Sequence, residues 1–302
     1  MKIAITVDPE IPVPPQLYGG IERIVAMLAE GLIARGHEVV LFAHPQSQLA
    51  CRRVAWPGGS SLSLADTARN ACCLAVHSLR ERFDVIHSFS RVAYLLPMLP
   101  MRLPKLMTYQ REISARSVRW GHRLFRGTLM FTAVSHHLIR GLENEARFFV
   151  VPNGVPLHVY TATNSVPADA PLVFLGRVEA IKGTHLAIEV ARRSGRTLTI
   201  AGNIGDRDYY ERQIKPAVDG ITVRYIGAVN DAQKNELLRS AAALLMPVQW
   251  EEPFGIVMAE ALACGTPVIG LNRGAVPEVV EEGVTGFVCE TVETMVTAVG
   301  RL

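Results

Sequence analysis

The chain has 302 residues, of which 49% are hydrophobic and 20% charged. This length predicts two domains, and the composition excludes disordered and collagen-like proteins. The net charge of +3 is unevenly divided, because residues 1–155 hold 18 Lys and Arg against 11 Asp and Glu, and the remainder holds 13 against 17. The first half is therefore the better candidate to meet an anionic partner, but it is too weakly basic to predict nucleic-acid binding.

Membrane spans, disulfides and metal sites are not expected. The longest uncharged apolar run, Val92–Met101, is ten residues long, whereas a membrane-spanning helix needs about 20. The five cysteines are odd in number and show no zinc-ligand spacing, which predicts reduced thiols. No signal-peptide pattern opens the chain, so we expect a cytoplasmic protein.

Short β-branched runs alternate with helix-length segments in the first half of the chain. The helices expected there are Ile21–Arg35, whose apolar residues recur at helical spacing, and Ser63–Arg82. The expected strands are Lys2–Val7, Glu38–Ala43, Asp84–His87, Leu106–Tyr109, Phe131–Ser135 and Phe148–Val151. This alternation predicts a parallel sheet with right-handed crossovers.

The same pattern restarts after residues 158–171, a Thr-, Ala- and Pro-rich stretch that we interpret as a hinge. Helices are expected from about Gly183, Arg207, Asp231, Gly255 and Ala275, and a last one over Thr291–Leu302. The expected strands are Leu172–Leu175, Leu198–Ala201, Thr222–Ile226, Leu244–Pro247 and Val268–Leu271. The sequence therefore predicts an α/β protein with two doubly wound domains, 1–160 and 171–302, joined by a linker at 161–170 and facing each other across a cleft that holds the ligand.

The first strand leads into a proline-rich loop that ends in Tyr18-Gly19-Gly20 at the start of a helix. Two glycines let the backbone approach a ligand at a helix N-terminus, although a simple glycine turn has the same spacing. The loop lacks the Gly-x-Gly-x-x-Gly pattern of dinucleotide-binding proteins, which disfavours an NAD-dependent oxidoreductase.

Two cations follow the first strand of the second half, Arg177 and, five residues later, Lys182. Both could reach a pyrophosphate at the carboxyl end of the sheet, Arg as a fork and Lys as a point charge. Solvated cations at a loop start would look the same.

The densest pattern is Glu251-Glu252-Pro253-Phe254-Gly255-Ile256-Val257-Met258-Ala259-Glu260-Ala261-Leu262-Ala263-Cys264-Gly265-Thr266-Pro267-Val268. Glu252 lies before an expected helix and Glu260 inside it, and the amides of Phe254–Ile256 form the helix start. Carboxylates here could accept hydrogen bonds from sugar hydroxyls while the amides bind a phosphate. An acidic residue on an ordinary helix face is the alternative.

These motifs together resemble the retaining glycosyltransferases of family 4, which have the GT-B fold. Further segments that match the family are Val151-Pro152-Asn153-Gly154-Val155, Gly274-Ala275-Val276-Pro277-Glu278 and Gly283-Val284-Thr285-Gly286. The resemblance covers essentially the whole chain and is most specific from Pro171 onwards.

The resemblance implies a nucleotide-sugar donor bound by the second domain. Arg177 and Lys182 match residues that neutralise the diphosphate leaving group. Glu260 matches the carboxylate that binds the ribose hydroxyls, and Glu252 the one near the transferred sugar. The resemblance further implies donor contacts from the backbone of Gly19 and Gly20, of Gly227 and Val229, and of Phe254, Gly255 and Ile256.

The resemblance also implies transfer with retention, without an enzyme nucleophile, a metal or another cofactor, to a small-molecule, glycan or lipid acceptor. In many relatives a histidine lies near the reacting sugar, where this chain has Gln110, which cannot exchange protons near pH 7. His87 is an alternative acceptor-side residue, although a histidine at a buried strand end can be purely structural.

The chain also stops before the crossover helix expected at the end of the fold, which predicts a fragment or a compact variant with loosely arranged domains.

Five arginines with interleaved apolar side chains mark the stretch Arg111–Arg126. Such a stretch could bind anionic lipid at a membrane surface or guide an acidic acceptor, whereas a solvated Arg-rich helix is the simpler interpretation. Rival functions for the whole chain are a nucleotide-sugar epimerase on the same fold and a nucleotide-sugar-binding pseudoenzyme.

Overall fold

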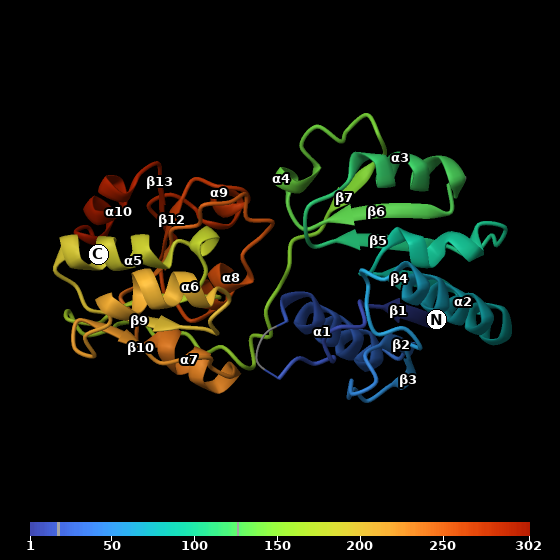
Figure 1. Ribbon diagram of the computed structural model, residues 1–302, viewed down its shortest axis with the longest axis horizontal. Coiled ribbons are helices and arrows are strands. Elements are labelled where there is room, and N and C mark those ends of the chain that lie inside the picture. Colours follow the sequence, from blue (N-terminus) through green and yellow to red (C-terminus); the bar gives the residue numbers. More distant parts are fainter. Residues whose placement is uncertain (17–18, 126) are drawn as a thin grey trace. The chain divides into compact units, whose positions relative to one another are not determined.

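The computed structural model describes residues 1–16, 19–125 and 127–302, so Tyr18 of the glycine loop and Arg126 of the basic stretch lie outside the described residues. The chain divides into two compact units, Met1–Asn153 and Gly154–Leu302 (Figure 1). Each unit is a parallel sheet covered by helices, and each is described below by itself.

The first unit contains a seven-stranded sheet in the order β3-β2-β1-β4-β5-β6-β7. Its strands are β1 Lys2–Thr6, β2 Glu38–Ala43, β3 Arg52–Ala55, β4 Val85–Ser88, β5 Lys105–Tyr109, β6 Leu129–Ala133 and β7 Phe148–Val150. All neighbouring strands pair in parallel. The carboxyl ends of the strands therefore meet at one edge of the sheet, where ligands of such folds bind.

Helices cover both faces of this sheet, as parallel sheets require. They are α1 Gly20–Ala34, α2 Leu64–Glu81, the 3₁₀ helix η1 Val92–Met98, α3 Ala115–Leu124 and α4 His136–Ile139. One core lies between the sheet and α2, η1 and α3, and it includes Phe42, Tyr94 and Phe131. The apolar residues Ile24, Val25 and Ala29 of α1 are also buried, as the helical spacing predicts.

The second unit contains a six-stranded parallel sheet in the order β10-β9-β8-β11-β12-β13. Its strands are β8 Leu172–Leu175, β9 Leu198–Ala201, β10 Val223–Tyr225, β11 Ala243–Met246, β12 Val268–Leu271 and β13 Gly286–Cys289. Its helical segments are η2 Ala180–Lys182, α5 Thr184–Ser194, α6 Arg207–Tyr209, η3 Tyr210–Ile214, η4 Lys215–Ala217, α7 Asp231–Arg239, α8 Ile256–Ala263, α9 Val276–Val279 and α10 Val292–Val299.

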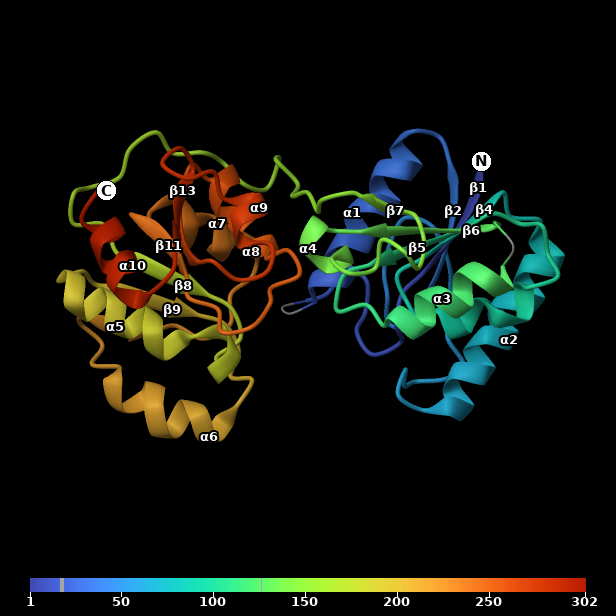
Figure 2. The ribbon, with the colours of Figure 1, turned by 90° about the horizontal axis from the view of Figure 1, so that it is seen from above.

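Two hydrophobic cores sandwich this second sheet. One joins it to α5 and α10, and the other joins it to α7, α8 and α9 on the opposite face (Figure 2). The predicted fold class, with two doubly wound parallel-sheet domains, is confirmed.

The structure differs from the sequence prediction at two edge strands and at the unit boundary. Strands β3 and β13 were not expected. The boundary falls at 153/154, and the stretch interpreted as a hinge packs on the second unit. Tyr160 is buried there, and the backbone N–H of Thr163 donates to the carbonyl of Cys264 at 2.9 Å. These contacts arise because the stretch, although irregular, offers an aromatic side chain and free backbone groups to α7 and α8.

Candidate functional site

The carboxyl ends of β8 and β11 bring Lys182 and Glu252 together in the second unit. Lys182 ends η2 and is followed by Gly183 in the left-handed conformation, φ 74°. A Cβ atom at Gly183 would lie 1.9 Å from the carbonyl oxygen of Pro247, so only glycine permits this approach of the two loops. The backbone N–H of Gln249 donates to the carbonyl of Ile181 at 2.8 Å and ties the loops together.

Glu252 accepts two hydrogen bonds on one carboxylate oxygen. The Lys182 ammonium donates to Glu252 Oε2 at 2.7 Å, and the indole N–H of Trp250 donates to the same oxygen at 2.9 Å. The ammonium also lies 4.5 Å from the centre of the Trp250 ring, a cation–π contact. The Glu252 side chain is 9% exposed and that of Lys182 is 17% exposed. Solvent therefore screens the attraction between these two charges only weakly, and we call the pair shielded.

The loop that carries Glu252 is held by the turn at Gly274 and Ala275. The backbone N–H of Ala275 donates to the carbonyl of Glu252 at 2.8 Å, and the N–H of Gly274 donates to Glu251 Oε2 at 2.8 Å. After Glu252, Phe254 is buried, and Gly255 adopts φ 77° as the residue before α8. The first amides of α8, beginning at Ile256, therefore open beside a carboxylate–ammonium pair, and such amides can bind the oxygens of a phosphate.

Glu260, on α8, is held in a buried ion pair that sequence reasoning missed. Lys234 of α7 donates to Glu260 Oε1, and the Tyr160 hydroxyl donates to the same oxygen at 2.7 Å. Glu260 is 3% exposed and Lys234 8%. Because both donors bind Oε1, Oε2 is the carboxylate oxygen that a ribose hydroxyl could use.

The other predicted donor residues follow β8 and β10. Arg177 Nη2 lies 2.8 Å from Glu179 Oε1 within its own loop. Gly227 has φ 76°, and its carbonyl accepts a hydrogen bond from the N–H of Gly202 at 2.8 Å, which ties the end of β10 to that of β9. Val229, two residues further along the chain, is buried.

In the first unit, Gly19 and Gly20 begin α1. Gly19 has φ 149°, and a Cβ atom there would lie 2.7 Å from Pro15 Cβ and 2.9 Å from Glu22 Oε2. Glu22 is buried and burial raises its pKa. Burial likewise raises the pKa of Asp8, although the Arg111 guanidinium, which donates to Asp8 Oδ2, opposes that shift.

Gln110 and His87 both occupy restrained positions. Gln110 forms a reciprocal amide pair with Asn153, in which the two N···O distances are 2.8 and 2.7 Å. His87 Nε2 lies 2.7 Å from Thr108 Oγ1, which in turn lies 2.6 Å from Thr132 Oγ1. Burial lowers the pKa of His87 to about 4, so this imidazole is neutral at pH 7.

Family profiles match both units. The profile of glycosyl transferases group 1 matches residues 163–300, and that of glycosyltransferase family 4 matches residues 18–159. The chain belongs to glycosyltransferase family 4. The resemblance inferred from the motifs is thereby confirmed, and so is the assignment to the broad class of glycosyltransferases.

Several relatives of this family 4 glycosyltransferase are named enzymes or solved structures. It is 26% identical to the phosphatidyl-myo-inositol mannosyltransferase of Mycobacterium leprae, over 89% of this chain and 79% of the relative. It is 24% identical to spore coat protein SA of Bacillus subtilis, over 97% of this chain and 86% of the relative. A solved glycosyltransferase involved in avilamycin A biosynthesis shares 26% identity and superposes with a TM-score of 0.76, covering 100% of this chain and 88% of the other.

The structure adds partners to the predicted site residues of this glycosyltransferase. Trp250, Lys234 and Tyr160 support the two predicted carboxylates, and Asn153 holds Gln110. Asn153 lies in a segment that already matched the family, so that signal was present in the sequence. Lys234 and Tyr160 gave no signal, because nothing in their local patterns connects them to Glu260.

Proposed function

We propose that this protein transfers a sugar, with retention of configuration, from a nucleoside-diphosphate sugar to an acceptor, without a metal cofactor. The observation that carries the proposal is the shielded Lys182–Glu252 pair, 2.7 Å apart, beside the first amides of α8. Lys182 and Arg177 would stabilise the negative charge that develops on the departing diphosphate. Glu252 would bind the transferred sugar, and Glu260 the ribose.

The nucleotide-sugar donor is supported by a solved structure with the same fold. An Anabaena protein in complex with UDP and glucose superposes with a TM-score of 0.76 at 20% identity, covering 100% of this chain and 89% of that one. A lysine has three donors, so Lys182 can keep its bond to Glu252 and still donate to a phosphate oxygen.

Proton transfer in this proposal does not use a protein histidine. Gln110 is not titratable, and its amide is engaged by Asn153. Burial lowers the pKa of His87 to about 4, so this imidazole is a weak base, and its Nε2 is bonded to Thr108. The outgoing phosphate would then accept the acceptor's proton on the face from which the sugar is attacked, which is consistent with retention.

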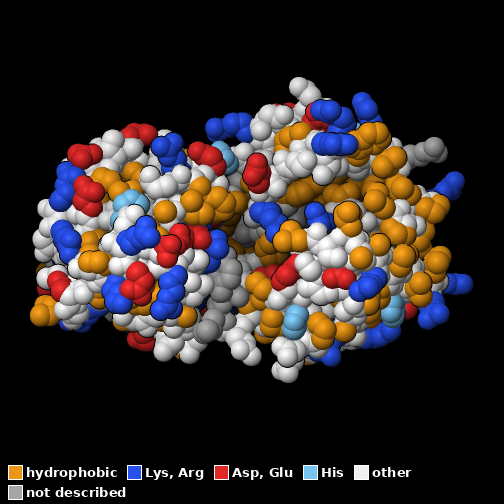
Figure 3. All heavy atoms as spheres, in the orientation of Figure 1, with side chains coloured by type: hydrophobic (Ala, Val, Ile, Leu, Met, Phe, Trp, Pro, Cys, Tyr) orange, Lys and Arg blue, Asp and Glu red, His pale blue; other side chains and the backbone are white. Residues whose placement is uncertain are grey.

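We also propose a peripheral contact of α3 with an anionic membrane from the cytoplasmic side. Arg116, Trp120 and Arg123 are exposed and share one side of this helix, since they are spaced by three or four residues, and Val118 is buried on the other. Figure 3 shows Lys and Arg side chains over the region that α3 occupies in Figure 1. No helix in the described ranges combines the length and apolarity needed to cross a membrane.

A lipid acceptor is supported by the relative named as a phosphatidyl-myo-inositol mannosyltransferase.

The test is turnover of UDP-, GDP-, ADP- and TDP-glucose, measured as nucleoside diphosphate released to water or to added acceptors. We expect Lys182→Ala and Glu252→Ala each to lower turnover about 10²-fold, the usual cost of removing one transition-state contact. Lys215→Ala is the matched control, because Lys215 forms an exposed ion pair with Glu211 at 2.6 Å. EDTA should leave turnover unchanged, and the anomeric configuration of the product reports retention.

Each rival function gives a different result in the same experiment. If the protein is a pseudoenzyme, both the wild type and Glu252→Ala would bind the donor, and neither protein would turn it over. An epimerase would form a new sugar nucleotide without any acceptor. Full turnover of both Lys182→Ala and Glu252→Ala would show that the site assignment is wrong.

A further inference from the structure

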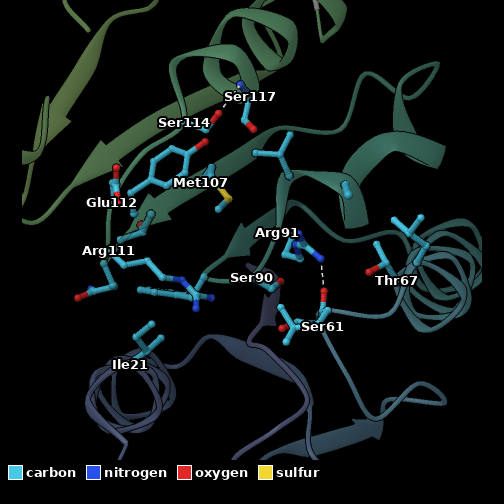
Figure 4. Close-up of a pocket in the computed structure, with 18 residues that line it drawn as sticks. Ile21, Ser61, Thr67, Ser90, Arg91, Met107, Arg111, Glu112, Ser114 and Ser117 are labelled. Carbon is cyan, nitrogen blue, oxygen red and sulfur yellow. Dashed lines mark hydrogen bonds between the residues drawn. The ribbon is translucent and has the colours of Figure 1, made fainter. Parts of the chain in front are cut away.

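Some of the cations in this protein bond to groups of their own unit. Figure 4 shows one of them, Arg91, at a cavity of about 430 Å³ in the first unit, where its guanidinium donates to the carbonyl of Ser61. Lys234 of the second unit is another, because its ammonium donates to Glu260, the carboxylate that the proposed function assigns to the ribose. We therefore ask what Lys234 does for a ligand through Glu260.

Lys234 is surrounded by groups of the second unit, and it is 8% exposed. Besides Glu260, its ammonium lies 3.4 Å from Asp231 Oδ1, one turn earlier on α7, and 5.7 Å from the centre of the Tyr160 ring, a cation–π contact. Glu260 is 3% exposed, and a buried carboxylate without a partner is costly. Lys234 therefore compensates the charge of Glu260 before any ligand binds.

Tyr160 is held in place by the irregular stretch that contains it. The N–H of Thr161 donates to Asn235 Oδ1 at 2.9 Å, and Asn235 follows Lys234 on α7. Tyr160 is 3% exposed, and its hydroxyl donates to Glu260 Oε1 at 2.7 Å. One turn of α7 therefore fixes both the ammonium and the hydroxyl that bond this carboxylate.

Both donors bind the same oxygen of Glu260. Lys234 and Tyr160 each donate to Oε1, so the carboxylate cannot rotate without breaking two hydrogen bonds. Its orientation is thus set in the free protein, and Oε2 is the oxygen left for a ligand hydroxyl. A hydrogen bond to an ionised acceptor is about twice as strong as one to a neutral acceptor.

From these contacts we infer that Lys234 and Tyr160 are positioning residues for Glu260, and that the oriented carboxylate makes the site select ribonucleoside diphosphates over 2′-deoxyribonucleoside diphosphates. A buried acceptor loses a hydrogen bond when the matching hydroxyl is missing, and it cannot recover that bond from water. The inference rests on the proposed donor site and names the class of its nucleotide. It disfavours thymidine diphosphate sugars as donors, because their pentose lacks the 2′-hydroxyl.

The experiment is calorimetric titration of the intact protein with UDP, GDP and ADP and with the 2′-deoxy form of each. For the base that binds, we expect the ribonucleotide to bind about tenfold to 100-fold more tightly than its 2′-deoxy form, as a hydrogen bond to a charged group predicts. Tyr160→Phe keeps the ring beside Lys234 and removes the hydroxyl that orients Glu260. It should weaken ribonucleotide binding about fivefold and leave 2′-deoxynucleotide binding unchanged.

Tyr209→Phe is the matched control. Tyr209 is 6% exposed and belongs to the core on the opposite face of the sheet, where its hydroxyl accepts a hydrogen bond from the N–H of His185 at 2.9 Å. Loss of this buried hydroxyl should lower the thermal midpoint and leave the ratio of ribonucleotide to 2′-deoxynucleotide affinity at the wild-type value.

Two variants of Lys234 test the charge. Lys234→Met leaves the Glu260 carboxylate buried without its cation, so the ratio should fall. Lys234→Arg keeps the charge and should keep most of the ratio. If Lys234→Met does not fold, as judged by its thermal unfolding, Tyr160→Phe decides the inference alone.

A merely structural role of Tyr160 predicts that the affinities for both forms fall together in Tyr160→Phe. That result would overturn the inference, as would an unchanged ratio in Tyr160→Phe or equal binding of the two forms by the wild type. In each of these cases the donor site stands. If no nucleoside diphosphate binds the wild type, the proposed function fails and this inference fails with it.

Discussion

The position and the electrostatic surroundings of each candidate site residue depend on the groups that the fold places beside it. Lys182 and Glu252 are 70 residues apart, yet the glycine turn at Gly183 and the Gly274–Ala275 turn leave them 2.7 Å from each other. The pair is shielded, so removing one partner would leave the other as a poorly compensated charge. For this reason the control is Lys215→Ala, which removes the exposed Lys215–Glu211 pair. The loss of that pair should have little effect.

His87 gives a prediction about stability and pH. Its pKa is about 4 in the folded protein and about 6.5 in an unfolded chain, so the unfolded state binds its proton more readily. The stability that neutral His87 contributes is therefore complete above about pH 6.5 and is lost as the pH falls toward 4. At pH 4.5 the loss amounts to about 2.5 kcal/mol.

Urea unfolding at pH 7 and pH 4.5 would measure this loss. In His87→Gln, which keeps a hydrogen-bonding side chain without titrating, the fall in unfolding free energy should be smaller by about 2.5 kcal/mol. Carboxylates titrate equally in both proteins and cancel in the comparison. His158→Gln, at an exposed position, is the control; an unchanged pH dependence in His87→Gln would contradict the burial argument.

Among the elements, α3 carries the prediction about membranes. Each arginine near an anionic surface contributes about 1 kcal/mol, so Arg116→Gln/Arg123→Gln should bind vesicles containing phosphatidylglycerol roughly 30-fold more weakly at low salt. Arg119 is omitted because it donates to Glu145 Oε2 at 2.7 Å. The matched control, Arg207→Gln/Arg212→Gln, removes two exposed arginines of the second unit. Equal binding by both double variants, or no binding by the wild type, would rule out the α3 contact.

The helices and strands also show which elements can be predicted from local sequence patterns. Strands that are mostly buried, such as β2, β8, β9 and β12, were predicted with the bounds that the structure has. Strand β3 was missed because three of its four residues are exposed and two are arginines, so it lacks a buried-strand pattern. Strand β13 was missed because glycine begins it, and that glycine is required where a Cβ would lie 1.9 Å from the carbonyl of Val268.

Some features of the candidate site can likewise be predicted from local sequence patterns, and others cannot. Glu252, Glu260, Lys182 and Arg177 could be found because their motifs are contiguous in sequence. The pairing of Glu260 with Lys234, and of Gln110 with Asn153, depends on which loops the sheet topology brings together.

At the scale of the whole molecule, the two units differ in charge. We propose that the first, with its excess of Lys and Arg, meets the acceptor, and that the second, with the Lys182–Glu252 pair, binds the donor. This division predicts that variants in one unit change the affinity for one substrate and leave that for the other intact.

The central claim is a nucleoside-diphosphate site in the second unit, and thermal unfolding against UDP, GDP, ADP, TDP and NAD tests it most directly. At 100 times its dissociation constant, a ligand adds about 2.7 kcal/mol, enough to raise the midpoint by a few degrees. The account predicts that one nucleoside diphosphate stabilises the wild type, that Lys182→Ala loses this effect while Lys215→Ala keeps it, and that NAD has no effect. Stabilisation by NAD alone, or by no nucleotide at all, would contradict it.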